Sequence, residues 1–246
     1  MGSGFTSIII LTFNALPFTR ECIESVRRFT NEPYELIVVD NGSSDGTAEY
    51  LQHLTGIKLI RNKTNGGYSR GNNQGIAVSQ GEYVVFLNND TVVTADWLKK
   101  LLTCIRSDSR IGAVGPKTNH LGNRRQVIKN PPYRNIPEMH LFAQGFGGSN
   151  PAKWENMPWL SGFCLLTSRR IINRVGTFDE RFGLGLCEDN DFCLRLRKAG
   201  YRLVCAGDTF IHHFQSRTFK ENGMDRGKML KENLVKLRAK WPQNGC

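Results

Sequence analysis

Four short apolar runs alternate with segments of helical character through the first ninety residues. The runs cover residues 7–12, 34–40, 57–61 and 83–87. Apolar residues at helical spacing fill the first gap, and shorter helical segments, at residues 47–54 and 70–79, fill the second and third. Strands that alternate with helices at this spacing predict an α/β fold, with a mostly parallel sheet flanked by helices.

Polar side chains follow the apolar runs. Thr12 and Asn14 end the first run, Asp40 ends the second, and Asn88, Asn89 and Asp90 end the fourth. Ligands of open parallel sheets bind outside the carboxyl ends of the strands, so we expect these side chains to converge. Carboxylate and amide oxygens suit Mg²⁺ or Mn²⁺, which makes Asp90 a candidate metal ligand. The sequence Asn88-Asn89-Asp90 is also typical of a turn that simply ends a strand, and this alternative remains open.

Two polar junctions follow strands in this first half. Asp40 could accept the imide N–H of uracil or thymine, which cytosine cannot supply, although residues 41–47 also read as a tight strand-to-helix turn. The glycine-rich residues 65–75 open a helix, where backbone N–H groups could meet a nucleotide or its phosphates. This junction has neither the Walker lysine nor the dinucleotide G-x-G-x-x-G spacing, which disfavours an ATPase and an NAD enzyme.

Acidic residues begin a later helix, predicted over residues 188–199. Asp191 and Arg195 stand at i and i+4, so we expect them to pair. Glu188 and Asp189 then remain, and one of them could face the cleft as a general base. Acids at a helix start are also common complements of the helix dipole, which is the structural alternative.

His212 and His213 follow a predicted strand over residues 201–206. One of them could complete a metal site with Asp90, and imidazole suits Mn²⁺ better than Mg²⁺. A purely structural histidine is the alternative.

The remaining chain completes a single domain over residues 1–246. We expect residues 5–118 to form a half that binds a nucleotide sugar, with Asp96 capping a helix that runs through Ile105 and a short strand at 112–115. Residues 119–156 show no sustained helix or strand periodicity in their apolar residues, which is typical of a functional loop or lid. Strands at 159–167 and 201–206 and a helix at 169–175 belong to the second half, residues 157–218. A basic helix over 224–241 lies in the extension at 219–246.

Composition limits the partners and the compartment. The net charge of +11 favours an anionic partner, but the basic residues are scattered, so we expect no nucleic-acid groove. Seven cysteines without a Cys-x-x-Cys pair predict reduced, mostly buried thiols and a cytoplasmic protein. No signal peptide and no apolar run of ~18 residues is seen, so any contact with the inner face of a membrane would be peripheral.

The ordered set of motifs resembles the family 2 glycosyltransferases, which have the GT-A fold. The first half contributes residues 7–14, 40–47 and 87–90. The second half contributes Trp159-Leu160-Ser161-Gly162, Phe178-Asp179-Glu180, Glu188-Asp189-x-Asp191 and a late His-x-x-x-x-Thr, so that the resemblance runs from about Ser7 to about Thr218.

This resemblance implies roles for individual residues. The donor would be bound by Thr12, Asn14 and Asp40 at the base, by Gly67 and Asn73 near the nucleoside, and by Asn88 and Asn89 beside the metal ligand Asp90. Asn88 stands where the family's Asp-x-Asp site has its first acid. Asp189 resembles the catalytic base, with Glu188 as its neighbour. His213 aligns better than His212 with the histidine that helps hold the metal or diphosphate, and Trp159 would line the floor under a sugar.

The resemblance implies an inverting enzyme, assisted by Mn²⁺ or Mg²⁺, that moves a sugar from a UDP-sugar or dTDP-sugar to a hydroxyl acceptor. The acceptor could be a glycan, a lipid-linked glycan or a protein, in bacterial surface or protein glycosylation. A non-catalytic nucleotide-sugar or glycan-binding module of a larger enzyme is the alternative. A nucleotidyltransferase is disfavoured, because residues 10–14 lack a glycine-rich basic signature. A processive polysaccharide synthase is disfavoured as well, because it would need membrane helices.

Overall fold

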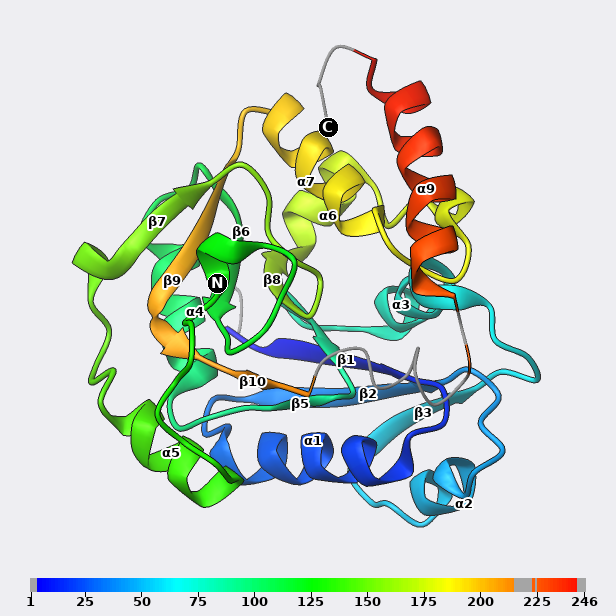
Figure 1. Cartoon of the computed structure of the whole chain (residues 1–246), viewed down its shortest axis with the longest axis horizontal. Helices are drawn as coiled ribbons and strands as arrows, with labels where there is room; N and C mark the ends of the chain where they lie inside the picture. Colours follow the sequence, from blue (N-terminus) through cyan, green and yellow to red (C-terminus); the bar gives the residue numbers. More distant parts are fainter. Residues whose placement is uncertain (1–3, 215–222, 224, 243–246) are drawn as a thin grey trace.

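The structure, a computed structural model, describes residues 4–214, 223 and 225–242. Eight strands form one sheet in the order β3-β2-β1-β4-β8-β6-β9-β7 (Figure 1). They are β1 (Thr6–Thr12), β2 (Tyr34–Asp40), β3 (Ile57–Arg61), β4 (Tyr83–Asn88), β6 (Ile111–Lys117), β7 (Trp154–Met157), β8 (Cys164–Ser168) and β9 (Arg202–Phe210). Two further strands, β5 (Thr91–Val92) and β10 (His212–His213), form a small antiparallel sheet.

Helices lie on both faces of the large sheet. They are α1 (Leu16–Phe29), α2 (Thr47–Gln52), α3 (Gly67–Val78), α4 (Trp97–Arg106), α5 (Ile136–Gln144), α6 (Arg169–Val175), α7 (Glu188–Lys198) and α9 (Arg226–Lys240). Short 3₁₀ helices cover Arg124–Gln126, Pro151–Lys153 and Glu180–Phe182. The predicted α/β fold, with a mixed and mostly parallel sheet flanked by helices, is confirmed.

The first half follows the predicted strand and helix order closely. β1 pairs in parallel with β2 and β4, and β2 pairs in parallel with β3. Asp96 stands at the N-cap of α4 as expected, but its φ is 58° and its side chain makes no capping hydrogen bond. The cap position was therefore predicted correctly and its hydrogen bond was not.

The second half departs from a purely parallel arrangement. β8 lies in the middle of the sheet and runs antiparallel to both β4 and β6. It begins only at Cys164, so the strand predicted over 159–167 was placed too early. Residues 159–163 instead form a loop that leads into β8 at the end of the sheet.

Residues 119–156 are less irregular than the sequence predicted. They contain α5 and most of β7, and Met139 and Ala143 of α5 pack against Val92 and Phe210. The helix is short and begins with an N-cap, in which the Asn135 side chain accepts from the Glu138 backbone N–H. Nine residues are too few for a clear helical period, which is why this element was missed.

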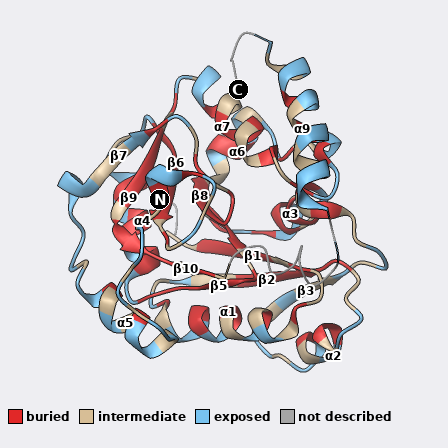
Figure 2. Cartoon of the chain, viewed as in Figure 1, coloured by how far each residue is buried: buried red, intermediate tan, exposed pale blue. Residues whose placement is uncertain are grey.

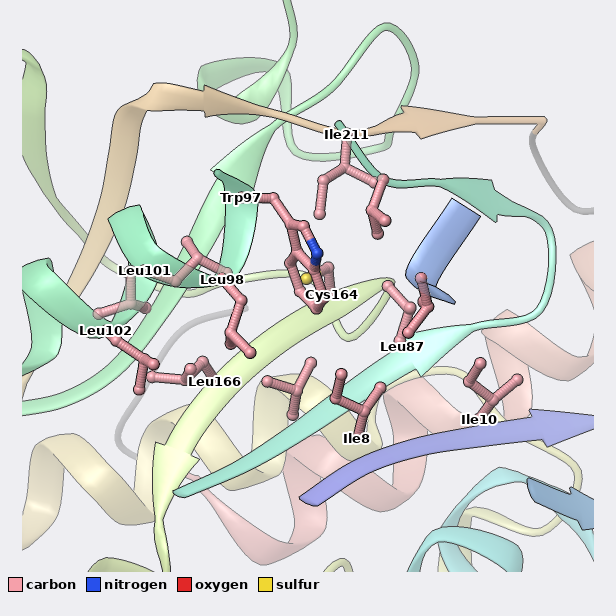
Figure 3. Packing of buried hydrophobic residues seen from close by; sticks show 14 of the residues in the cluster. Ile8, Ile10, Leu87, Trp97, Leu98, Leu101, Leu102, Cys164, Leu166 and Ile211 are labelled. Carbon is pink, nitrogen blue, oxygen red and sulfur yellow. The ribbon is translucent and has the colours of Figure 1, made fainter. Parts of the chain in front are cut away.

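Two apolar layers fix the sheet between its helices. In β1, Ile8 and Ile10 face one cluster with α1 and α4, while Ile9 faces the other with α3 and α6. The first cluster surrounds Trp97, which lies among Leu98, Cys164 and Ile211 in Figure 3. Figure 2 shows the inner strands of the sheet buried over most of their length, whereas α9 is largely exposed on its outer side. The core therefore holds the strand ends at fixed positions.

The described cysteines are buried, as predicted. They are Cys22, Cys104, Cys164, Cys187, Cys193 and Cys205, and Cys246 lies outside the described residues. Burial raises the pKa of Cys22 to about 12, so its thiol is protonated and unreactive at neutral pH. None of the helices in the described part of the chain has the length and apolar character that crossing a membrane requires.

Candidate active site

A cavity of about 260 Å³ opens at the carboxyl ends of β1 and β4. The start of α3, the loop before β8, the start of α7 and the first turns of α9 complete its wall. The predicted site residues that line it are Thr12, Gly67, Asn88, Asn89, Asp90, Glu188, Asp189 and His213. The fold thus brings together residues separated by up to two hundred positions in the sequence.

Asp90 and His213 meet because β5 and β10 pair antiparallel, with Thr91 opposite His213. His213 Nε2 lies 3.1 Å from Asp90 Oδ1, and its ring stacks on Phe163. His212 faces away, with Nδ1 2.7 Å from the Tyr133 hydroxyl, and burial lowers its pKa to about 4. His213 is therefore the histidine beside Asp90.

The Asp90 and His213 pair fits a divalent cation. One carboxylate oxygen and one imidazole nitrogen are ligands that Mn²⁺ accepts. In this structure Asp90 Oδ1 and His213 Nε2 lie 3.1 Å apart, within hydrogen-bonding distance, and both would be candidates to hold the cation. The described residues contain no group of three or more His, Cys, Asp or Glu side chains that could hold a metal. Two protein ligands would leave the other positions to substrate oxygens and water.

A buried hydroxyl and amide cluster lies under the same part of the cavity. Thr12 Oγ1 lies 2.8 Å from Thr19 Oγ1, and the Asn89 side chain donates to both hydroxyls. Thr12 and Asn89 are 1% and 4% exposed, so their side chains shape the floor of the cavity. Asn88 is half-buried beside them and lines the cavity.

Gly67 packs where a side chain could not fit. Its φ is 85°, and a Cβ there would run into the backbone of Gly183 and lie 2.8 Å from Leu184 Cα. The Tyr68 backbone N–H also donates to the Leu184 carbonyl. Gly67 therefore brings the start of α3 into contact with the loop that precedes α7.

Glu188 and Asp189 form a buried acidic pair at the start of α7. Asp189 accepts hydrogen bonds from the backbone N–H groups of Gly162 and Asn190, at 3.0 and 2.8 Å. Glu188 is 6% exposed, and its Oε2 has no hydrogen-bond partner among the described residues. Burial and the neighbouring negative charge raise the pKa of Glu188 to about 8. Burial also raises the pKa of Asp189, but the hydrogen bonds from the Gly162 and Asn190 N–H groups oppose that shift and favour the charged form of Asp189.

A family model described as "Glycosyl transferase family 2" matches residues 7–176, which is more than half of the chain. The chain belongs to glycosyl transferase family 2. It is an enzyme that transfers a sugar from a nucleotide sugar.

Related sequences extend this assignment beyond the matched region. The N-acetylglucosaminyl-diphospho-decaprenol L-rhamnosyltransferase of Mycobacterium tuberculosis is 27% identical over 241 residues, covering 86% of this chain and 76% of that protein. An uncharacterised protein of Sinorhizobium fredii is 29% identical over 254 residues. There the match covers 98% of this chain but only 28% of the relative, so the chain spans about a quarter of that longer protein.

Solved structures show the same GT-A fold. A mannosyltransferase from Pyrobaculum calidifontis, in complex with GDP-Man and Mn²⁺, superposes with a TM-score of 0.69 at 20% identity, covering 98% of this chain and 65% of that one. GalNAc-T7 with UDP, GalNAc and Mn²⁺ gives 0.66 at 15% identity, covering 85% of this chain and 43% of that one. At these identities the likeness establishes the fold.

Four of the residues predicted to bind substrate do not line the cavity of this family 2 enzyme. Asp40 Oδ1 accepts from the Ser43 N–H, and Asn14 Oδ1 accepts from the Ser44 N–H, so both hold the turn after β2. Asn73 exchanges hydrogen bonds with the Phe178 backbone. Trp159 packs against the α3 side of the core. In the structure these side chains contact the turn after β2, the Phe178 backbone and the core, and they are outside the cavity lining.

The cavity of the glycosyltransferase is also lined by residues that the sequence did not single out. Tyr68 lines the cavity, and its hydroxyl donates to the Gly162 carbonyl, opposite the N–H that holds Asp189. Arg226 and Leu230 reach the cavity from α9. The glycine-rich junction already marked the Tyr68 region, whereas nothing local distinguishes Arg226 from the other basic residues of its helix.

Proposed function

We propose that this enzyme transfers a sugar, with inversion, from a UDP-sugar or dTDP-sugar to a hydroxyl acceptor. The observation that carries the proposal is a single cavity whose lining includes Asp90, His213 and Asp189. The two side chains proposed to hold the cation that binds the diphosphate, and the side chain proposed as the base, therefore line the same cavity. Both are needed when a sugar leaves its nucleotide as a hydroxyl attacks.

The donor would lie along the ends of β1, β2 and β4. Asp40 would accept the imide N–H of the base through its second carboxylate oxygen after movement of the adjoining turn, and Asn14 would hold that turn. Asp90 and His213 would hold Mn²⁺ or Mg²⁺, with Asn88 beside them. When bound, the cation stabilises the negative charge that develops on the departing diphosphate.

Asp189 would act as the base. It would take the proton of the acceptor hydroxyl as the oxygen attacks the anomeric carbon and the bond to the nucleoside diphosphate breaks. A single displacement of this kind inverts that carbon. The Gly162 N–H holds the carboxylate in place and favours its charged form, while the raised pKa of Glu188 favours a proton on that neighbour.

The acceptor we favour is a lipid-linked glycan. The supporting relative is the Mycobacterium tuberculosis enzyme, whose name describes a glycosyl-diphospho-decaprenol substrate. The cavity wall beside the acids carries Leu184, Leu186 and Leu230, together with the cation Arg226, which suits an acceptor with apolar and anionic groups. A surface polysaccharide and a protein side chain are the other acceptors to be compared.

Calorimetric titration of UDP, dTDP and GDP, with and without Mn²⁺, tests the donor proposal. We expect UDP or dTDP to bind only with Mn²⁺, and GDP to bind at least tenfold more weakly. Sugar nucleotides of the preferred base would then be screened by their slow hydrolysis, and acceptors by product mass. Binding of a nucleotide with no hydrolysis and no transfer to any acceptor class would favour the binding-module alternative. Absence of nucleotide binding would refute the donor site.

A further inference from the structure

We propose that Asn233 of α9 is a positioning residue of the transfer reaction, because it fixes the loop that places Glu188 and Asp189. This inference rests on the proposed role of Asp189 as the base. The loop in question, residues 182–187, will be called the acid-pair loop. It connects the 3₁₀ helix Glu180–Phe182 to α7 and forms one wall of the cavity.

The acid-pair loop has a backbone that must be held by its surroundings. Gly183 and Gly185 have φ values of 63° and 143°. Leu186 and Cys187, which are not glycines, have φ values of 75° and 73°. Consecutive left-handed residues with side chains are unfavourable by themselves and persist only where other contacts fix them. Cys187 is the residue immediately before Glu188, so this conformation sets the direction in which α7 begins.

Asn233 supplies the contacts that fix this backbone. Its side-chain amide donates to the carbonyls of Phe182, Gly185 and Leu186, at 2.8, 2.7 and 3.0 Å. Asn233 is 3% exposed, so these bonds are shielded from water. Lys236 donates to Asn233 Oδ1, which fixes the amide group with its nitrogen toward the loop.

The opposite side of the acid-pair loop meets α3. The Tyr68 N–H donates to the Leu184 carbonyl, and Gly67 packs directly against Gly183. Together with Asn233, these contacts account for the loop carbonyls at 182, 184, 185 and 186. The loop is therefore clamped between the donor-side helix α3 and the C-terminal helix α9.

The far end of α9 is attached separately. Lys240 Nζ lies 2.7 Å from Asp191 Oδ1, and the Trp241 indole N–H donates to the same carboxylate. Lys240 also pairs with Asp179. Loss of the Asn233 amide would thus leave α9 docked while releasing the loop. The expected consequence is a displaced Asp189, since its bond to the Gly162 N–H depends on where α7 starts.

The test is Asn233→Asp, an isosteric change that places an oxygen against three carbonyl oxygens. Val235→Asp is the matched control, because it adds the same charge on the same helix at a position that is 66% exposed. We expect Asn233→Asp to lower kcat at least tenfold, with the donor KM within threefold of the parent. Amide hydrogens at residues 183–190 should exchange at least tenfold faster. The control should change neither quantity. If Asn233→Asp does not fold, Asn233→Ala replaces it in the same kinetic and exchange measurements.

The outcomes separate this inference from the proposed function. If kcat stays within threefold of the parent while the melting temperature falls, Asn233 is only structural and the inference is wrong. Unchanged exchange at residues 183–190 would also overturn it. If the parent enzyme transfers sugar to no acceptor, the proposed function fails, and the exchange comparison still decides whether Asn233 holds the loop.

Discussion

The two sides of the cavity are built in different ways. On the donor side, Asp90 directly follows a buried parallel strand, and its histidine partner is brought in by pairing of β5 with β10. On the acid side, Glu188 and Asp189 follow an acid-pair loop with two non-glycine residues at positive φ. That loop is held by side-chain and backbone bonds from α3 and α9. Regular sheet geometry thus positions one side, and a few remote hydrogen bonds position the other.

The difference between the two sides predicts which property, binding or turnover, a substitution on each side should change. A strand end in a packed sheet is hard to move, so changes on the donor side should affect binding through the substituted group itself. The acid side depends on a strained loop, so changes outside the cavity should alter turnover. The predictions below test that contrast.

The largest effect is expected for Asp189→Asn. Removal of the base should lower kcat by about 10²–10⁴, because general-base contributions are of this size. Binding of UDP with Mn²⁺ should remain within threefold, since the donor side is unchanged. Single-turnover kinetics and calorimetry measure the two quantities. Asp96→Asn, an isosteric change at an exposed residue, is the control. A kcat within threefold of the parent would show that Asp189 is not the base.

Asp90→Ala should act on binding. We expect the Mn²⁺-dependent affinity for UDP to fall by about 10–100-fold, as loss of one charged ligand costs a few kcal/mol. Amide exchange at the acid-pair loop should stay unchanged, because contacts from α3 and α9 hold that loop. Faster exchange at residues 183–190 in this variant would contradict the separation of the two sides.

Gly67→Ala should affect both sides of the cavity, because Gly67 of α3 packs against the acid-pair loop. A Cβ would collide with the Gly183 backbone, and φ of 85° is unfavourable for alanine, so we expect a loss of about 2 kcal/mol in stability. A displaced acid-pair loop should lower kcat by about tenfold. Thermal unfolding and turnover check this. Gly66→Ala is the neighbouring control, since its Cβ would meet only the flexible side chain of Arg70. If Gly67→Ala weakens UDP binding alone, Gly67 acts on the nucleoside and not on the loop.

Glu188→Gln should have the smallest effect, and it should depend on pH. The folded protein keeps the Glu188 proton between the ordinary pKa of 4.5 and a pKa of about 8, while the unfolded chain has released it. The free energy of unfolding of the parent should therefore fall across this window, relative to the glutamine variant, and level off above pH 8. We expect a relative change of at least ~1 kcal/mol.

Denaturant titrations at pH 5 and pH 8 measure that change. Glu24→Gln, at an exposed position of α1, is the control. At neutral pH the turnover of Glu188→Gln should remain within threefold of the parent, because a neutral carboxyl is replaced by a neutral amide. An equal free-energy difference at both pH values would show that Glu188 does not titrate in this range.

Much of the first half was predictable because its signals are local. Each buried strand is an apolar run, and each polar side chain at its end is adjacent in sequence, so Thr12, Asn88 and Asp90 could be assigned to one edge of the sheet. The prediction that Asp191 pairs with Arg195 was confirmed for the same reason, since i and i+4 residues share a helix face. Helix α5 was missed because it is short.

The sequence alone determined the α/β order, the family resemblance and the identity of the acids. Only the tertiary structure decided that His213 and not His212 lies beside Asp90. It also decided that Asn14 and Asp40 hold the turn after β2 and are outside the cavity lining. It also decided that Asn233 holds carbonyls 47 to 51 positions away. Local periodicity records which face of an element is buried, whereas a contact across the fold leaves no repeating pattern, because it depends on how the elements pack.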